Sequence, residues 1–285
     1  MTKIETQNRW LDHPYSENTS LEFNKFVLPS SENPLDRFSI LSLGELGDAA
    51  LLDRKETKYL FPEELLPDIL PGLESEYHIL DIKGRRTFAY LSVYIDTPDR
   101  VFYKQHQAGA RPRWKIRQRT YLNSGISFLE VKRKDNRNLT QKIRRQIEQP
   151  KDQQLLVRGL LEQTRYPGSA ADLEPVLKTH YTRITLVHKS RQERITLDYR
   201  LSFSDGVCTT SLPDLVVAEV KQNRLNLRSP FLIHIKQFRG QPSNFSKYCL
   251  GSLLLDPTLK YNRFKPILIQ IQSLKAKEKN YEWTL

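Results

Sequence analysis

Charged residues recur at alternate positions in several short, otherwise apolar stretches of this chain. They form the pairs Glu56 and Lys58, Glu130 and Lys132, and Glu219 and Lys221, and the run Lys115, Arg117 and Arg119. Alternate residues of a β-strand project to the same face, so each stretch would present one charged and one apolar face. A single pair of this kind is usually a solvated strand face. Its repetition on several strands predicts strands that close around a highly charged ligand.

The overall charge indicates that this ligand is an anion. The 285 residues include 45 Lys and Arg against 33 Asp and Glu, which gives a net charge of +12 and a pI near 9.6. Nucleic acid, anionic lipid and polyphosphate-like molecules are the partners that such a charge suits. The chain starts without a signal-like apolar run, and no apolar stretch approaches the ~20 residues that span a bilayer. Its two cysteines, Cys208 and Cys249, suit a reducing compartment, and we expect a cytoplasmic protein.

The pattern of residues predicts a main domain rich in strands. Alternating, β-branched and aromatic content predicts strands near 54–61, 86–96, 112–121, 126–134, 140–148, 180–189, 192–203 and 214–222. Helical signals cover 62–70, 152–163, 172–178, 229–238 and 245–255, the last after an expected N-cap at Ser243 and Asn244. We expect residues 1–48 to form a polar N-terminal arm, residues 49–270 the tunnel domain, and residues 271–285 a C-terminal tail. Eight strands are enough to close a barrel.

Motifs of several common enzyme classes are missing from the sequence. There is no Gly-x-x-x-x-Gly-Lys-Ser/Thr phosphate loop, and the stretch from Gly44 to Gly47 is better interpreted as a turn. The six histidines form no zinc-binding cluster. Ser246 lacks the surroundings of a hydrolase nucleophile, so capping or packing explains it.

Eight short motifs, taken together, resemble the VTC domain, the catalytic module of the vacuolar transporter chaperone polyphosphate polymerase. This domain belongs to the triphosphate tunnel metalloenzyme superfamily, which also holds the CYTH proteins. The motifs, in chain order, are Arg54-x-Glu56-x-Lys58-Tyr59, Ser92-Val93-Tyr94-Ile95-Asp96-Thr97, Lys115-Ile116-Arg117-Gln118-Arg119-x-Tyr121, Glu130-Val131-Lys132, Tyr181-x-Arg183, Arg194-Ile195-Thr196-Leu197-Asp198, Glu219-Val220-Lys221 and Phe245-Ser246-Lys247-Tyr248. Each is weak alone, but eight in the right order are specific.

The resemblance implies an α+β fold, a closed antiparallel eight-stranded β-barrel with helices packed on its outside. It implies an enzyme that transfers the γ-phosphoryl group of ATP to a growing inorganic polyphosphate chain with a divalent metal, Mn²⁺ or Mg²⁺. The catalytic, phosphate-orienting positions would be Lys58, Arg117, Arg119, Lys132, Arg183 and Arg194. Glu130, Lys221 and Lys247 would line the substrate path, and Glu219 would bind the metal with Glu56 as a second ligand. The sequence departs from the family pattern at Lys178 and Asn244.

Three functions remain open from the sequence. The first is an ATP-dependent polyphosphate polymerase that works with membrane-associated partner subunits or without them. The second is a triphosphate hydrolase with the same lumen; the presence of Arg54 where those enzymes usually carry a second glutamate argues against it. The third is a non-catalytic binder of polyanions or nucleic acid, which the basic pI suits but for which no nucleic-acid-binding signature is found.

Overall fold

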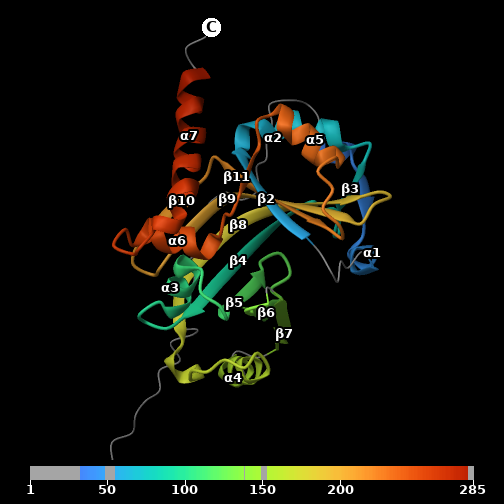
Figure 1. Cartoon of the computed structure of the whole chain (residues 1–285). Helices are drawn as coiled ribbons and strands as arrows, with labels where there is room; N and C mark the ends of the chain where they lie inside the picture. Colours follow the sequence, from blue (N-terminus) through green and yellow to red (C-terminus); the bar gives the residue numbers. More distant parts are fainter. Residues whose placement is uncertain (1–32, 49–54, 138, 149–152, 282–285) are drawn as a thin grey trace, which may run out of the picture.

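The computed structural model describes residues 33–48, 55–137, 139–148 and 153–281. One large sheet forms the centre of the molecule, and its helices lie against it and beyond its ends (Figure 1). The strands are β1 (Ser39–Leu41), β2 (Lys55–Pro62), β3 (Tyr77–Leu80), β4 (Thr87–Asp96), β5 (Arg113–Tyr121), β6 (Ser127–Lys134), β7 (Thr140–Ile147), β8 (Glu174–His188), β9 (Glu193–Ser204), β10 (Thr209–Leu212), β11 (Leu215–Gln222) and β12 (Gln241–Ser243). The α-helices are α1 (Leu43–Asp48), α2 (Leu66–Ile69), α3 (Val101–Ala108), α4 (Gln153–Gln163), α5 (Pro230–Gln237), α6 (Lys247–Leu255) and α7 (Lys265–Tyr281).

The α+β prediction holds, but the prediction of a closed eight-stranded barrel is not confirmed. The sheet has twelve strands, and its main path runs β12-β2-β11-β9-β8-β4-β5-β6-β7. All pairings are antiparallel except that of β1 with β3. Within the described residues the end strands β12 and β7 do not pair, so the sheet curves without closing. The outer edge of β2 pairs instead with β12, after which the chain turns into α6.

Several elements predicted from local sequence patterns differ from those in the structure. The helix predicted for residues 172–178 is wrong, because residues 174–178 belong to β8, a fifteen-residue strand that pairs with β4 and β9. The turn predicted between Gly44 and Gly47 is also wrong, since both residues lie in α1. Strands β3, β10 and β12 were missed because three or four residues are too few for a periodic signal.

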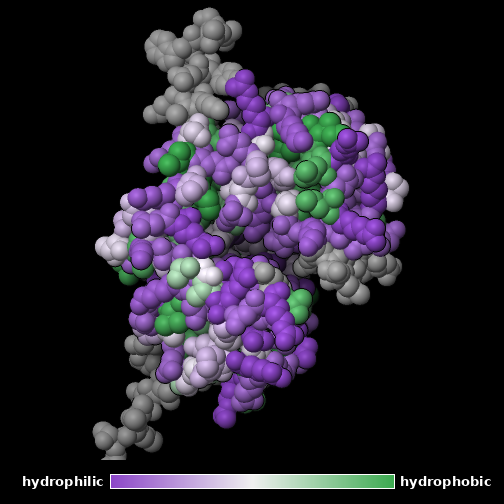
Figure 2. All heavy atoms as spheres, viewed as in Figure 1, coloured by the Kyte–Doolittle hydropathy of each residue, from purple (hydrophilic) through white to green (hydrophobic). Residues whose placement is uncertain are grey.

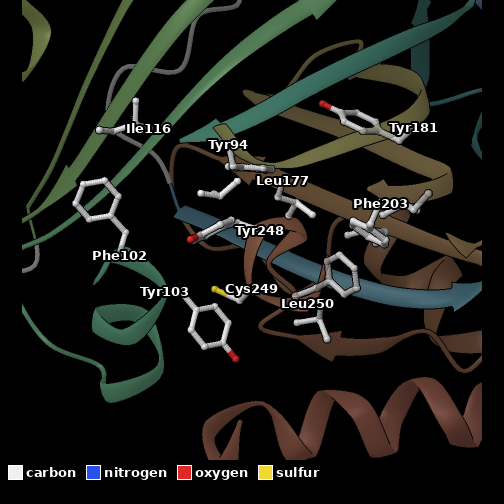
Figure 3. Close-up of a cluster of buried hydrophobic side chains, with 14 of the residues drawn as sticks. Tyr94, Phe102, Tyr103, Ile116, Leu177, Tyr181, Phe203, Tyr248, Cys249 and Leu250 are labelled. Carbon is white, nitrogen blue, oxygen red and sulfur yellow. The ribbon is translucent and has the colours of Figure 1, made fainter. Parts of the chain in front are cut away.

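The core places the start of α6 beside the sheet. Ser246, rather than Ser243 or Asn244, is the N-cap of α6, and its hydroxyl accepts a hydrogen bond from the backbone N–H of Cys249. Tyr248 and Cys249 are buried against α3, as Figure 3 shows. The Tyr248 hydroxyl donates to buried Asp96, which also accepts the backbone N–H groups of Phe102 and Tyr103. Asp96 thereby joins the end of β4 to both helices and fixes where α6 begins.

Some described elements lie beyond the predicted domain limits. Strand β1 and helix α1 fall within residues 1–48, and α7 runs from residue 265 into the predicted tail. Residues 1–32 are outside the described part of the chain, so the arm stays a prediction. Both cysteines are free; Cys208 is exposed and Cys249 is buried. No helix among the described residues is both long and apolar enough to cross a membrane.

Candidate active site

Eight strands and the start of α6 surround a cavity of about 170 Å³. Nine cationic and four acidic side chains line it, a net charge of +5. They are Lys58, Lys115, Arg117, Arg119, Lys132, Lys142, Arg183, Lys221 and Lys247, with Glu56, Glu130, Asp198 and Glu219. Strand alternation brings them together, because Lys115, Arg117 and Arg119 of β5 all project to the same face. The cavity is therefore a lumen suited to a compact polyanion.

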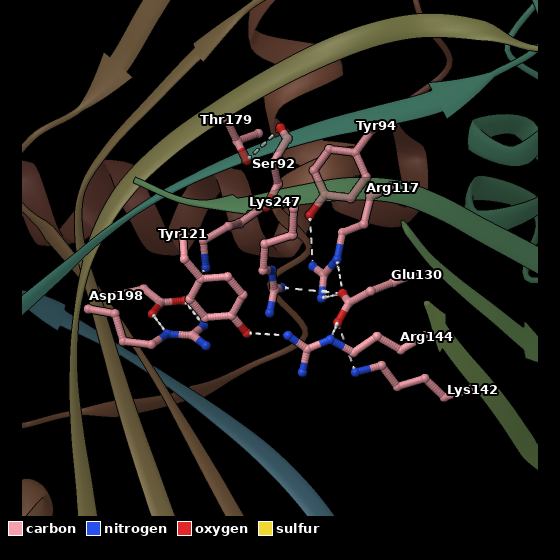
Figure 4. Close-up of polar contacts among 12 residues, drawn as sticks. Ser92, Tyr94, Arg117, Tyr121, Glu130, Lys142, Arg144, Thr179, Asp198 and Lys247 are labelled. Carbon is pink, nitrogen blue, oxygen red and sulfur yellow. Dashed lines mark hydrogen bonds and ion pairs between the residues drawn. The ribbon is translucent and has the colours of Figure 1, made fainter. Parts of the chain in front are cut away.

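Glu130 organises one wall of the lumen. Its side chain is 4% exposed and its carboxylate lies 2.6 Å from Nε of Arg117 and 3.0 Å from Nζ of Lys142. Figure 4 shows both cations, with Arg144, converging on it. Burial alone would raise the pKa of Glu130, but Arg117, Arg119 and Lys142 together lower it far below its usual range. Glu130 is thus a fixed anion that orients the cations around it.

Asp198 organises the opposite wall. Arg183 donates from Nε at 2.5 Å and from a terminal nitrogen at 2.8 Å to its two oxygens, and Lys247 binds the same carboxylate. The Lys247 ammonium also lies 4.4 Å from the centre of the Tyr181 ring. Burial opposes the ionised form of Asp198, but Arg183 and Lys247 lower its pKa well below the ordinary value. A bidentate pair fixes the plane of a guanidinium, so Arg183 is held in one orientation toward the lumen.

Glu56 and Glu219 are the two carboxylates that the sequence analysis predicted as metal ligands. They lie on the neighbouring strands β2 and β11, and Lys58 Nζ lies between them, 3.6 Å from Glu56 and 3.7 Å from Glu219. Lys221 binds Glu219 as well. Burial would raise the pKa of Glu219, but Lys221 and Lys58 lower it well below normal, so it is ionised at neutral pH.

These two carboxylates fit a hard divalent cation that also binds substrate. Mg²⁺ is commonly held by one or two carboxylates together with substrate phosphates. No group of three or more His, Cys, Asp or Glu side chains within the described residues is placed to hold a metal alone. If such a cation binds, oxygens of an anionic ligand would have to complete its coordination, and that ligand would also attract Lys58 and Lys221 away from the two glutamates.

Lys115 differs from Lys58, Lys142, Lys221 and Lys247, each of which pairs with a carboxylate. Its ammonium contacts the Ser246 hydroxyl at 3.2 Å, and among the residues that the structure describes it forms no ion pair with a carboxylate. Burial, followed by the nearby charges of Lys58, Arg117 and Lys132, lowers its pKa to about 8. An anion in the lumen would supply the missing negative charge and raise this pKa again.

Triphosphate binding should therefore weaken as the pH rises through about 8, because Lys115 loses its proton there. Calorimetric titration with tripolyphosphate across this range should show proton uptake on binding, and Lys115→Met should remove the step while lowering affinity at pH 7. The unliganded protein should gain stability between about pH 8 and the ordinary pKa of 10.5, because the unfolded state binds more protons there. Lys104→Met, at an exposed site, is the control. An unchanged pH step in Lys115→Met would assign the titration to another group.

A second cavity of about 560 Å³ continues from the first. The two share Lys58, Lys115, Lys132 and the start of α6. Six cations, namely these three lysines with Arg113, Lys134 and Arg263, line the second cavity, and no described acidic residue does. Burial first, and then Arg111 and Arg263, lower the pKa of Arg113, which reflects cations crowded without counter-charge. Asn244, one of the two departures from the family pattern, also lies here.

The structure brings together ten of the eleven residues selected from the sequence. Those ten line the first cavity: Lys58, Arg117, Arg119, Lys132, Arg183, Glu130, Lys221, Lys247, Glu219 and Glu56. Arg194 does not line it; this residue lies opposite Lys221, four residues before Asp198 on β9. The functional roles of these eleven residues remain predictions.

The sequence reasoning left out five charged or tyrosine residues that line the cavity. Lys115 and Lys142 could have been selected by their parity with Arg117 and Arg144. Asp198, named only as part of a motif, is both a luminal carboxylate and the ion-pair partner of Arg183. Tyr94 and Tyr181 carried no charge signal in the sequence.

Comparison with known proteins identifies one family. The family model described as the VTC domain matches residues 53–256. No curated protein matches the chain.

Solved structures are only distantly similar. A candidate adenylate cyclase from Bacillus halodurans is 13% identical, with 69% of this chain and 98% of that one covered and a TM-score of 0.44. The PH1819 protein from Pyrococcus horikoshii OT3 is 18% identical, with 72% and 98% covered and a TM-score of 0.39. A Hippeastrum protein described as having a dominant triphosphatase activity is 12% identical, with 73% and 98% covered and a TM-score of 0.42. These likenesses are too distant to bear on the function of the chain.

Proposed function

The chain belongs to the VTC domain family, and on this premise we propose that it is an ATP-dependent polyphosphate polymerase that requires a divalent metal. Its substrates are ATP and inorganic polyphosphate. We place it in the cytoplasm, together with membrane-associated partner subunits, and exclude nucleic acid from its proposed ligands.

The observation that carries this proposal is the continuation of the basic lining beyond the first cavity. A triphosphate needs only the net positive lumen around Glu130 and Asp198. The second cavity adds Arg113, Lys134 and Arg263 without any described carboxylate, and it shares Lys58, Lys115 and Lys132 with the first. A path of this kind suits a product with many phosphates, whereas a hydrolase that releases orthophosphate has no use for it.

The residues of the lumen hold donor and acceptor and neutralise their charge. A terminal oxygen of the polyphosphate attacks the γ-phosphorus of ATP, one P–O bond forms, and the bond from that phosphorus to the β–γ bridging oxygen breaks, so that ADP leaves. Such a transfer needs positioning and charge stabilisation more than covalent help. Arg117 and Arg183 are held in place by Glu130 and Asp198 before substrate binds, so little reorganisation is required.

Glu219 and Glu56 are the residues that would hold the metal, as their fit with a substrate-bound cation indicates. A bound Mn²⁺ or Mg²⁺ would neutralise charge on the phosphate oxygens. Lys247 contributes a further cation from the first turn of α6, where backbone N–H groups also favour anions. Lys58 donates to the carbonyl of Phe245 at 3.1 Å, and Lys115 contacts Ser246, so both lysines anchor the start of α6 at the open side of the sheet.

Incubation of the purified protein with ATP and Mn²⁺ should yield ADP and a long polymer that an exopolyphosphatase degrades. Short polyphosphate, added at the start, should shorten any lag because it supplies acceptor ends. Polymer and orthophosphate are measured in the same reaction. Stoichiometric release of orthophosphate without polymer would support a triphosphate hydrolase instead of a polymerase. Absence of nucleotide turnover with any divalent metal would favour the non-catalytic polyanion binder.

A further inference from the structure

An exposed apolar surface lies away from the lumen, on the loop between β11 and α5 and on α5 itself. Leu225 and Leu227 of the loop are 53% and 54% exposed, and Ile233 of α5 is 51% exposed. Figure 2 shows hydrophobic atoms gathered over α5 and ringed by hydrophilic ones. These three large aliphatic side chains are close in sequence and each is about half exposed. Exposed apolar groups of this kind commonly mark an interaction surface.

The loop is held firmly in the conformation that exposes these leucines. The backbone N–H of Asn226 donates to the Gln222 side chain at 3.0 Å, and that side chain donates back to the Asn226 carbonyl at 3.0 Å. Gln222 in turn donates to buried Glu193, which also accepts the hydroxyl of Tyr77. The backbone of Asn226 is thus tied to the core through Gln222, and Leu225 and Leu227 on either side of it are exposed.

The charged residues of this segment are all cationic. Arg224, Arg228, Lys236 and Arg239 are exposed, and residues 220–255 contain no Asp or Glu. Helix α5 turns its other face inward, where Phe231 and Ile235 are buried and His234 binds the carbonyl of Ile69. Aliphatic tips within a cationic rim match the boundary between acyl chains and anionic headgroups. Protein interfaces are commonly anchored by aromatic side chains, whereas the three large side chains exposed here are all aliphatic.

We propose that Leu225, Leu227 and Ile233, with their rim of Arg224, Arg228, Lys236 and Arg239, form a docking surface for an anionic lipid bilayer. The leucines insert at the level of the headgroups, and the arginines and the lysine bind lipid phosphates and carboxylates. Lys221 of the lumen precedes Leu225 by only four residues, so docking brings this end of β11 close to the bilayer. Lipid binding by this surface does not depend on polymer synthesis in the lumen.

Co-sedimentation of the full chain with vesicles tests this proposal. Vesicles of phosphatidylcholine with phosphatidylserine are compared with vesicles of phosphatidylcholine alone, in the presence of tripolyphosphate so that luminal cations are occupied. Leu225→Ser with Leu227→Ser should lower the partition coefficient by roughly tenfold or more, because apolar burial is lost. Arg224→Gln with Arg228→Gln should remove the preference for phosphatidylserine.

Leu139→Ser with Leu155→Ser is the matched control, since these leucines are 64% and 73% exposed elsewhere on the chain. It should bind within about twofold of the unchanged protein, and thermal unfolding should show that all variants are folded. Equal binding to both vesicle types, or full binding by the Leu225→Ser and Leu227→Ser variant, would overturn the proposal. Loss of a dimer in that variant, without vesicle binding by the unchanged protein, would assign the surface to a second copy instead.

Discussion

Glu219→Gln is expected to reduce metal-dependent turnover by about 100-fold or more, equivalent to about 2.7 kcal/mol of transition-state stabilisation. Glu219 is ionised at neutral pH, because Lys221 and Lys58 lower its pKa despite burial. Glutamine keeps the shape of the side chain but removes the charge that a divalent cation requires. Steady-state rates over a wide range of Mn²⁺ and Mg²⁺ concentrations measure the effect.

Two further variants test whether the effect is specific to Glu219. Glu56→Gln should cause a smaller loss, because Glu56 contacts Lys58 at the more exposed edge of the same site. Glu162→Gln replaces a glutamate that is 67% exposed and paired with Arg158 on α4, and it should behave as the unchanged protein does. Near-normal activity of Glu219→Gln at all metal concentrations would remove Glu219 from the metal site.

Arg183→Ala is expected to damage both binding and stability. Loss of a charge-assisted contact with phosphate should weaken tripolyphosphate binding by about 1.5–3 kcal/mol. Crowding of like charges alone would predict that removing a luminal cation stabilises the fold. Asp198 reverses that expectation, because its side chain is 3% exposed and loses its bidentate partner. The free energy of unfolding should fall by about 3 kcal/mol, as when a buried ion pair is broken.

Arg119→Ala provides the comparison for this prediction. Arg119 lies 3.8 Å from Glu130, which keeps closer contacts with Arg117 and Lys142. This variant should lose affinity for tripolyphosphate with a much smaller loss of stability. Adding Asp198→Asn to Arg183→Ala should restore part of the stability and none of the affinity. Urea unfolding measures the stability, and calorimetric titration measures the affinity for tripolyphosphate. An Arg183→Ala protein with unchanged stability and unchanged affinity would show that the pair contributes to neither.

The sequence alone predicted which charged residues of the site share one face of a strand. Arg117 and Arg119, or Glu219 and Lys221, share a face because of backbone geometry within one strand, and no tertiary contact is needed to know it. Ile116, between Lys115 and Arg117, and Val220, between Glu219 and Lys221, predicted an apolar opposite face, and both are buried. Family membership was likewise predicted from the order of short motifs, and the match over residues 53–256 confirms it.

Only the tertiary structure decided which charges meet and where the lumen ends. Arg183 and Asp198 lie on paired strands, but Lys247 reaches the same carboxylate from a helix 49 residues further along the chain. Arg194 shares a strand face with Asp198 and still falls outside the cavity, while Lys115 falls inside it. Strand pairing also turned the predicted helix at 172–178 into β8 and left the sheet open between β7 and β12. Local sequence fixes the direction of a side chain within its strand, whereas register and curvature depend on partners far away in the chain, and these determine which cations surround one anion.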